Sequence, residues 1–211
     1  MNDFRIKTLV LGPLQTNSYV IYNNKSKEAI VVDPAAEAEK IINFLKEYDL
    51  VCRAIMLTHG HFDHILGVKD LKEATGAHVY AHEEKVDLLE NPNLNASSQV
   101  GQAYTVKVDV TLKDEQILDL IGQKIKVIHT PGHTAGGVCY LFEEENVLIS
   151  GDTLFQASIG RSDFPTGNGR VLIDSIRTKL MVLDENIDVY PGHGNPTSIG
   201  YEKRHNQFIT N

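Results

Sequence analysis

Hydrophobic positions along the chain fall into short runs separated by glycine, proline and asparagine, the pattern of strands that end in turns. Stretches with apolar residues three and four positions apart lie between several of these runs and predict amphipathic helices. The predicted strands are residues 8–11, 18–22, 29–32, 54–57, 78–80, 105–110, 125–128, 138–142, 147–149 and 187–190. The predicted helices are residues 36–48, 65–75, 83–90, 171–183 and 199–208.

The order of these elements predicts an α/β (α+β) chain folded in layers. The first strands follow one another with tight turns, which favours antiparallel pairing, whereas later strands alternate with helices, as in crossover units. A four-layer αββα sandwich combines both features, but periodicity alone does not choose it over a two-layer α/β sheet. No linker or low-complexity tract is present, so we expect residues 1–211 to form a single domain.

The chain is acidic, with 28 Asp and Glu against 20 Lys and Arg, and a formal net charge of −8. Because nucleic acids and anionic membranes are bound mainly through basic residues, this balance argues against both partners. The N-terminus lacks the cationic start and apolar run of a secretory signal, so we expect a cytoplasmic protein. Cys52 and Cys139 lie among apolar neighbours and are expected to be buried free thiols.

Potential metal ligands are concentrated directly after the predicted strand 54–57. The segment HGHFDH, residues 59–64, places three imidazoles and one carboxylate within six residues. Chance would produce this pattern in roughly one chain in a thousand of this composition. On a tight loop that opens a helix, His59 and His61 can point at one position while Asp63 and His64 point at a neighbouring one. The alternative interpretation is that these residues form the polar start of a helix and that the histidines are merely solvated.

Three further predicted strands end in one possible ligand each, and this repetition argues for a common site. His133 follows strand 125–128, Asp152 follows strand 147–149, and His193 follows strand 187–190. The carboxyl ends of strands are the usual place for ligand sites in open α/β sheets. The candidate ligands are therefore His59, His61, Asp63, His64, His133, Asp152 and His193.

Seven nitrogen and oxygen donors imply two divalent metal ions, because a catalytic zinc uses about three protein ligands and keeps one position open. One carboxylate would be shared, and Asp152 is suited to bridge. Imidazole-rich ligation without thiolates suits Zn²⁺ best, although iron or manganese would also be held. Two such ions about 3.5 to 4 Å apart acidify a water between them and polarise a carbonyl, which predicts hydrolysis. We take Asp63 and Asp152 as the catalytic carboxylates.

The residues 58–64, with His133, Asp152 and His193 in that order, resemble the metallo-β-lactamase fold superfamily over nearly the whole chain. The segments GDTLF (151–155), IGRSDFP (159–165) and YPGHG (190–194) are similar to the glyoxalase II group, especially its short bacterial members. The resemblance implies an αββα fold and two metal sites bridged by Asp152. It assigns His59, His61 and His133 to the first metal, and Asp63, His64 and His193 to the second.

The same resemblance implies a thioesterase that cleaves S-(2-hydroxyacyl)glutathione, typically S-lactoylglutathione, by a metal-bridging hydroxide. Longer members of the group carry a C-terminal helical domain whose basic residues grip glutathione, whereas 18 residues follow His193 here. We therefore expect a small-molecule thioester substrate and no separate C-terminal glutathione-binding domain. Lys203 and Arg204 could replace part of that grip, but such cations are more often solvated. A different acyl-thiol carrier stays open.

Two rival functions remain at this stage. Glutathione persulfide dioxygenases of the same superfamily resemble the chain through residues 160–164 and use one iron, which by resemblance would be held by His59, His133 and Asp152. His193 favours the hydrolase, because it supplies a ligand for a second metal. A metal-binding regulatory protein or scaffold without turnover is the third interpretation.

Several polar residues outside the seven have two interpretations. Arg161 could bind a substrate carboxylate or form an ion pair with Asp163 or Asp33. Asp33 could orient a metal-bound histidine or start a turn before a proline. The loop 91–103 could border the site, and 143–145 is expected to be a hairpin turn. Surface or packing roles are expected for His78, His82, His129 and His205.

Overall fold

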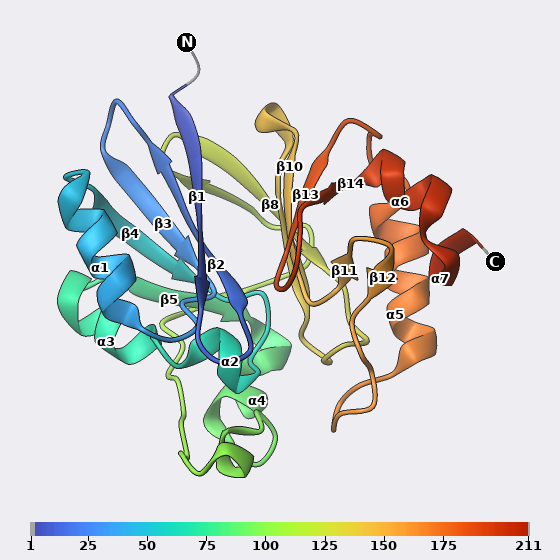
Figure 1. The fold of residues 1–211 in the computed structure, drawn as a ribbon, viewed down its shortest axis with the longest axis horizontal. Helices are drawn as coiled ribbons and strands as arrows, with labels where there is room; N and C mark the ends of the chain where they lie inside the picture. The colour runs from blue at the N-terminus through green and yellow to red at the C-terminus, as the bar shows by residue number, and fades with distance from the viewer. Residues whose placement is uncertain (1–2, 211) are drawn as a thin grey trace.

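The computed structural model describes residues 3–210 as two six-stranded sheets packed face to face, with helices on both outer faces (Figure 1). The first sheet contains, in spatial order, β1 (Phe4–Leu11), β2 (Thr16–Asn23), β3 (Glu28–Val32), β4 (Val51–Met56), β5 (His78–His82) and β6 (Val110–Leu112). The second contains β14 (Thr197–Ser198), β13 (Asp188–Pro191), β10 (Val147–Gly151), β9 (Val138–Phe142), β8 (Gln123–His129) and β7 (Ile117–Leu120). The four-layer αββα prediction is confirmed.

Helices cover the two outer faces, and a small hairpin lies beside the second sheet. The helices are α1 (Ala38–Glu47), α2 (Phe62–Ile65), α3 (Val68–Thr75), α4 (Val86–Glu90), α5 (Gly169–Ser175), α6 (Ile199–His205) and α7 (Gln207–Thr210). The hairpin is formed by β11 (Leu154–Phe155) and β12 (Ser158–Ile159).

Strand direction places the ends of four strands at one edge of the sandwich. As predicted, β1, β2 and β3 pair antiparallel, and crossovers then make β3, β4, β5 and β6 parallel. In the second sheet β13 runs parallel to β10, and β9 is antiparallel to both β8 and β10. Strands β8, β10 and β13 therefore point the same way, so the loops that follow them emerge together.

Three hydrophobic layers hold the four structural layers together. The central layer lies between the sheets and includes Tyr19, Met56 and Tyr140. In β9, alternate side chains divide between this layer and the one beneath α5, as the twofold period of a strand requires. The outer layers bury α1 and α3 against the first sheet and α5 against the second. Cys52 and Cys139 are buried free thiols, as predicted.

The predicted strand 105–110 is wrong except at Val110, which begins β6, because the preceding residues make other hydrogen bonds. The Val106 N–H donates to the Leu89 carbonyl in α4 at 3.0 Å. The Asp109 side chain accepts the Val79 N–H at 2.8 Å. Parallel pairing with β5 begins only with β6. Strand β7 and the short strands β11, β12 and β14 were not predicted.

Two predicted helices are divided, and two change helix type along their length. Residues 83–90 begin as a 3-10 turn, Glu83–Lys85, and continue as α4. Residues 65–75 are divided near Gly67, whose N–H donates to the Pro34 and Ala35 carbonyls at 2.9 Å. Residues 171–183 begin as α5 and continue as a π-helical stretch, Ile176–Leu180. Residues 199–208 are divided at Asn206, which has an extended backbone between α6 and α7. The acidic trio 143–145 forms a turn between β9 and β10, as predicted.

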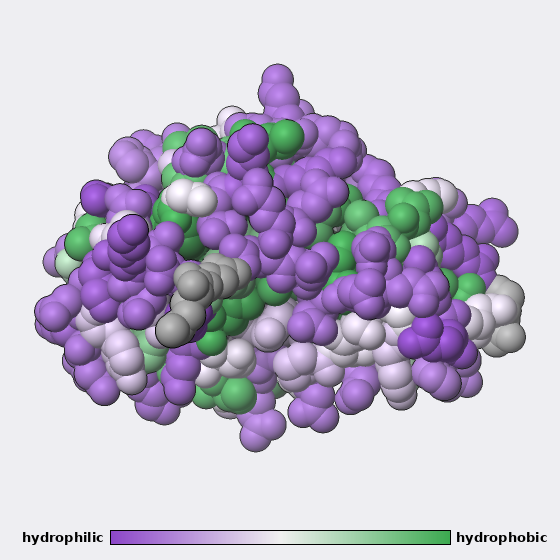
Figure 2. All heavy atoms as spheres, turned by 90° about the horizontal axis from the view of Figure 1, so that it is seen from above, coloured by the Kyte–Doolittle hydropathy of each residue, from purple (hydrophilic) through white to green (hydrophobic). Residues whose placement is uncertain are grey.

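None of the helices within residues 3–210 has the length and apolar character that crossing a bilayer requires. Figure 2 shows the face that looks upward in Figure 1, on which hydrophilic side chains predominate and hydrophobic ones form small separate groups.

Candidate metal centre

The seven histidine and aspartate candidates lie on four segments at one edge of the two sheets. The loop after β4 supplies His59 and His61, helix α2 supplies Asp63 and His64, and the segments after β8, β10 and β13 supply His133, Asp152 and His193. Glycine makes this convergence possible at Gly192, because a Cβ there would lie 2.1 Å from Asp152 Oδ1 and 2.7 Å from His64 Cε1. Backbone and side chains can approach this closely only without a side chain at that position.

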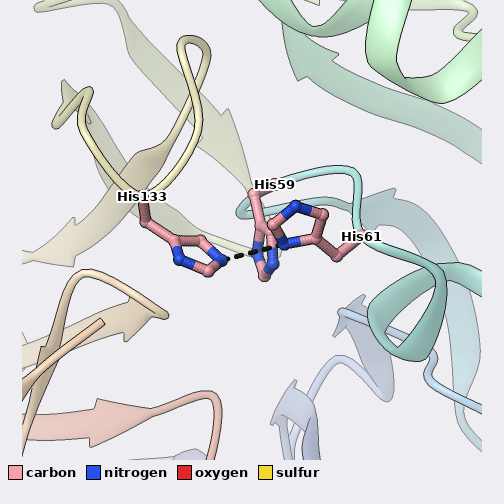
Figure 3. A group of neighbouring side chains, drawn as sticks. All are labelled: His59, His61 and His133. Carbon is pink, nitrogen blue, oxygen red and sulfur yellow. Dashed lines mark hydrogen bonds between the residues drawn. The ribbon is translucent and has the colours of Figure 1, made fainter. Parts of the chain in front are cut away.

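Three of the seven, His59, His61 and His133, form a first group with their rings facing one another (Figure 3). One ring nitrogen from each lies within 4.8 Å of the others. His61 Nδ1 is 2.9 Å from His133 Nε2, and the His59 ring centroid is 4.7 Å from that of His133. All three side chains are buried. These nitrogens could bind one metal ion.

Asp63, His64 and His193 form a second group of the same size. Asp63 Oδ2 lies 3.2 Å from His193 Nε2 and 3.5 Å from His64 Nε2. Two imidazoles and a carboxylate around one position are a donor set suited to zinc, iron or manganese.

Asp152 lies between the two groups and reaches both. Its Oδ1 is 3.3 Å from His64 Nε2 in the second group. Its Oδ2 is 3.6 Å from His133 Nε2 in the first group and 3.7 Å from His193 Nε2 in the second. One carboxylate with an oxygen available to each group is the arrangement that a pair of metal ions sharing a ligand requires.

Asp33 fixes the orientation of His64 and also starts a turn before a proline, so both interpretations of this residue apply. His64 Nδ1–H donates to Asp33 Oδ2 at 2.9 Å, which leaves Nε2 directed at Asp63 and Asp152. The Asp33 carboxylate also accepts the Thr58 N–H at 2.7 Å and the Thr58 hydroxyl at 2.5 Å. Its backbone has a φ of 48°, a left-handed conformation that aspartate tolerates in turns.

Backbone carbonyls orient two further histidines. His133 Nδ1 lies 2.6 Å from the Arg161 carbonyl, and His193 Nδ1 lies 3.1 Å from the Leu14 carbonyl. Each carbonyl accepts the ring N–H and so leaves Nε2 with its lone pair toward the site. The Thr16 hydroxyl donates to Asp63 Oδ2 at 3.0 Å. Leu14 and Thr16 were missed in the sequence, where only the Gly12-Pro13 turn marks this loop.

Burial and charge set the protonation of the site. Burial, together with the nearby His133, lowers the pKa of His61 to about 3, so this imidazole is neutral and has a free lone pair. Burial alone would lower the pKa of His64, but Asp152 and Asp63 raise it well above its usual value. Burial would raise the pKa of Asp152, yet His64 more than offsets this and lowers it. The carboxylates around His64 therefore favour a positive charge at the second group.

The buried polar atoms fit a pair of metal ions. His64 Nε2 and Asp152 Oδ1 face each other at 3.3 Å, are shielded from solvent, and form no hydrogen bond with any other described residue. Buried polar atoms are normally satisfied, so such a pair indicates a ligand that both can bind. A cation would replace the proton at His64 and satisfy both atoms.

The site opens into a cleft of about 400 Å³ with largely apolar walls. Its apolar lining residues are Leu14, Phe62, Ala96, Phe155, Ile159 and Phe164. Ala96 belongs to the loop 91–103, which therefore borders the site, as suggested. Phe164 lies over the first group, 4.9 Å from the His61 ring, and Phe155 lies 6.3 Å from the His193 ring near the second.

Arg161 lines the cleft but is engaged elsewhere. Its guanidinium makes two hydrogen bonds to Asp163, at 2.7 and 2.6 Å, and lies 4.1 Å from the centre of the Phe164 ring. The ion-pair interpretation therefore describes this structure, with Asp163 as the partner. Lys203 and Arg204 do not line the cleft. Lys203 donates to the Leu183 carbonyl, and Arg204 pairs with Glu185.

The remaining histidines lie outside the two groups. His78 is exposed, and His205 is exposed beside the Tyr201 ring. His82 is buried and stacks on His129 at a centroid distance of 4.1 Å, which joins the ends of β5 and β8. These contacts fit the predicted surface and packing roles.

Comparison with known proteins gives matches over most of the chain. The sequence profile described as the Metallo-beta-lactamase superfamily matches residues 11–193. The protein named hydroxyacylglutathione hydrolase GloC of Haemophilus influenzae is 37% identical over 210 residues, covering 97% of each chain.

Solved structures also match over most of the chain. The crystal structure titled BLEG-1 B3 metallo-beta-lactamase has a TM-score of 0.94 and 44% identity, covering 98% of this chain and 100% of that one. The structure titled TTHA1623 in a di-iron-bound form has a TM-score of 0.86 and 35% identity, covering 96% and 100% of the two chains. The αββα sandwich described above is therefore the fold that these proteins share.

Proposed function

The chain belongs to the metallo-beta-lactamase superfamily, and from this premise we propose that it is a binuclear metallohydrolase that cleaves thioesters of 2-hydroxy acids. The observation that carries the proposal is the position of Asp152, whose carboxylate lies against both groups of donors. A single-metal enzyme would need only one of these groups.

In this proposal, one metal is held by His59, His61 and His133, the other by Asp63, His64 and His193, and Asp152 is shared. Zn²⁺ suits these donors, while the di-iron form of the related TTHA1623 structure supports iron as an alternative. When bound, two such ions supply polarisation of the substrate carbonyl and a water acidic enough to attack it near neutral pH.

The chain's own residues prepare the site for this chemistry. The Leu14 and Arg161 carbonyls and the Asp33 carboxylate each accept a Nδ1–H, so the opposite nitrogens face the site without reorganisation. Asp63 and Asp152 have lowered pKa values despite burial, because histidines surround them. Both carboxylates are therefore ionised and balance the charge of bound cations. The largely apolar walls would limit the access of bulk water to a carbonyl bound in the cleft.

The name of the Haemophilus relative supports a thioester such as S-lactoylglutathione as the substrate. A second candidate is β-lactam hydrolysis, which is favoured by the 44% identity to the structure titled a B3 metallo-beta-lactamase. Both substrates place a carbonyl and a leaving group in the cleft, so the same site chemistry would serve. The persulfide dioxygenase alternative needs only His59, His133 and Asp152, and it leaves the second group without a role.

The proposal is tested by elemental analysis of protein purified without added metal, combined with substrate assays on the same preparation. We expect two metal equivalents per chain and hydrolysis of S-lactoylglutathione that exceeds hydrolysis of a chromogenic cephalosporin. Preferential cephalosporin cleavage would replace the thioesterase with the β-lactam candidate. One iron per chain with oxygen uptake on glutathione persulfide would reject the hydrolase altogether.

A further inference from the structure

The hairpin β11–β12 forms one wall of the cleft and is attached to the metal centre at both ends. It begins two residues after Asp152 and ends two residues before Arg161, whose carbonyl orients His133. Phe155 and Ile159 of this hairpin line the cleft. Strands of two residues have few hydrogen bonds of their own, so the position of this wall must be set by contacts from outside the hairpin.

The turn of the hairpin has a backbone conformation that requires support. Ala157 has a φ of 53°, in the left-handed region that residues with a Cβ seldom adopt. Such conformations persist only where the surroundings impose them. The support should therefore be found in groups that bind the backbone of this turn.

Glu202 of α6 is that support. Its side chain is completely buried, and its two oxygens accept the Ala157 N–H at 3.0 and 3.2 Å. The same carboxylate accepts the Thr197 hydroxyl at 2.6 Å and the Asn206 Nδ2 at 2.7 Å. Asn206, also buried, donates in addition to the Ser158 carbonyl at 3.0 Å. Both a donor and an acceptor of the turn are thus bound from behind the wall.

The chemistry of these contacts favours a carboxylate over an amide. Ala157 and Asn206 offer only N–H donors here, because the Asn206 Oδ1 already accepts the Phe208 N–H at 3.1 Å. A glutamine at position 202 would place an NH₂ group against one of these donors. A buried polar group is costly unless it is hydrogen-bonded, and this carboxylate accepts hydrogen bonds from Ala157, Thr197 and Asn206.

We propose that Glu202, together with Asn206, is a positioning residue that holds the β11–β12 wall against the metal centre and thereby sets how tightly the part of the substrate away from the scissile bond is bound. The proposal rests on the hydrolase function proposed above for its kinetic consequence. Its structural consequence, a displaced Phe155, does not depend on the reaction. The neighbouring Lys203 and Arg204 take no part, since they contact Leu183 and Glu185.

The kinetic test compares Glu202→Gln with Glu185→Gln, a matched control that removes an exposed carboxylate paired with α6. For the thioester or β-lactam that the wild type cleaves, we expect Glu202→Gln to raise KM roughly tenfold. We expect kcat and metal content to stay near the wild-type values, and Glu185→Gln to leave KM unchanged. An unchanged KM, or a parallel fall of kcat and metal content, would show that Glu202 does not act through the wall.

A second measurement reports on the wall without any turnover. The chain has no tryptophan, so Phe155→Trp introduces a single tryptophan into the hairpin, whose emission can be excited selectively beyond the absorption of the tyrosines. In the Glu202→Gln background we expect red-shifted emission and stronger acrylamide quenching than with Glu202 intact, while Glu185→Gln should change neither. Identical spectra would overturn the proposal even if the enzyme is active. Conversely, a shift in an inactive protein would leave this proposal standing while the hydrolase proposal fails.

If Glu202→Gln does not fold, Asn206→Ala provides the same test. This substitution removes the bond to the Ser158 carbonyl and leaves the carboxylate in contact with Ala157 and Thr197. We expect a smaller change in KM and quenching in the same direction. A folded Asn206→Ala variant with wild-type KM and quenching would contradict the proposal.

Discussion

At the scale of single residues, Asp152 connects the two donor groups, and its removal should affect both together. We expect Asp152→Ala to lower kcat by more than about a hundredfold and to reduce the metal content measured by elemental analysis. His59→Ala should do the same through the first group. The exposed His78→Ala serves as the control and should match the wild type. Hydrolysis at the parental rate by either site variant would contradict the proposed centre.

Asp33 acts on the site directly through His64, and its effect should be strongest at the second group. In Asp33→Asn an NH₂ group replaces one of the two oxygens. At the Oδ2 position, which accepts from the Thr58 hydroxyl and from His64, it leaves the His64 ring without its acceptor, and at the Oδ1 position it opposes the Thr58 N–H. We expect metal affinity at the second group to fall by roughly 10- to 100-fold, measured by titration against a chelator. Asp109→Asn removes a carboxylate remote from the site and is the control. Equal weakening of both metal equivalents would argue against this specific role.

The seven candidate ligands were accessible from the sequence because four of them are adjacent and the others follow strand ends. The groups that orient these ligands could not all be found from the sequence. The Leu14 carbonyl contacts His193 across 179 positions, and a backbone carbonyl leaves no mark in the sequence. Asp33 was found but left undecided, because an aspartate before proline is also a common way to begin a turn, and here it does both.

At the scale of elements, the segment that follows β13 requires glycine at two positions for different reasons. A Cβ on Gly192 would overlap Asp152 Oδ1, whereas Gly194 has open space but a φ of 76°. We expect Gly192→Ala to displace Asp152 and His64 and to lose metal and activity. Gly194→Ala should cost about 1 kcal/mol of stability from backbone strain while retaining metal. Thermal unfolding measures the stability lost to backbone strain in Gly194→Ala, and metal analysis measures the ligands displaced by the added Cβ in Gly192→Ala. Full metal content in Gly192→Ala would contradict the geometry.

Element boundaries could be predicted where the hydrophobic pattern was continuous. The predictions were wrong where charged side chains interrupted that pattern or where hydrogen bonds to another element determined the structure. The alternation in FRIKTLVL extends β1 back to Phe4, although only residues 8–11 were predicted, because Arg5 and Lys7 break the apolar run on the exposed face. Segment 105–110 has the alternation of a strand, yet Val106 donates to a carbonyl of α4 and pairing with β5 begins only near Asp109. Long-range pairing overrides local propensity in both cases.

At the scale of the whole molecule, strand periodicity did not decide between a four-layer αββα sandwich and a two-layer α/β sheet. Burial of both faces of the second sheet identifies the four-layer fold. In β9 and β10 every side chain is buried, so this sheet must be covered on both sides, by the other sheet and by α5. The sequences VCYLF and VLISG are continuous apolar or small runs that fit such strands. Which surface covers each face is a tertiary contact that the period of two does not encode.

The candidate ligands come from both halves of the sandwich, so bound metal should stabilise the entire fold. His59 to His64 follow the first sheet, while His133, Asp152 and His193 follow the second. At a free metal concentration about a thousandfold above Kd, one ion adds about 4 kcal/mol, which for a chain of this size raises Tm by roughly 8 to 16 °C.

We therefore expect chelation to lower the Tm measured by calorimetry and metal to restore it. Asp152→Ala should start near the Tm of stripped protein and respond weakly to added metal, while His78→Ala should behave like the wild type. A Tm that is independent of metal in the wild-type protein would mean that these loops are held together by the surrounding protein alone, and that the site does not bind cations strongly enough to link the two sheets.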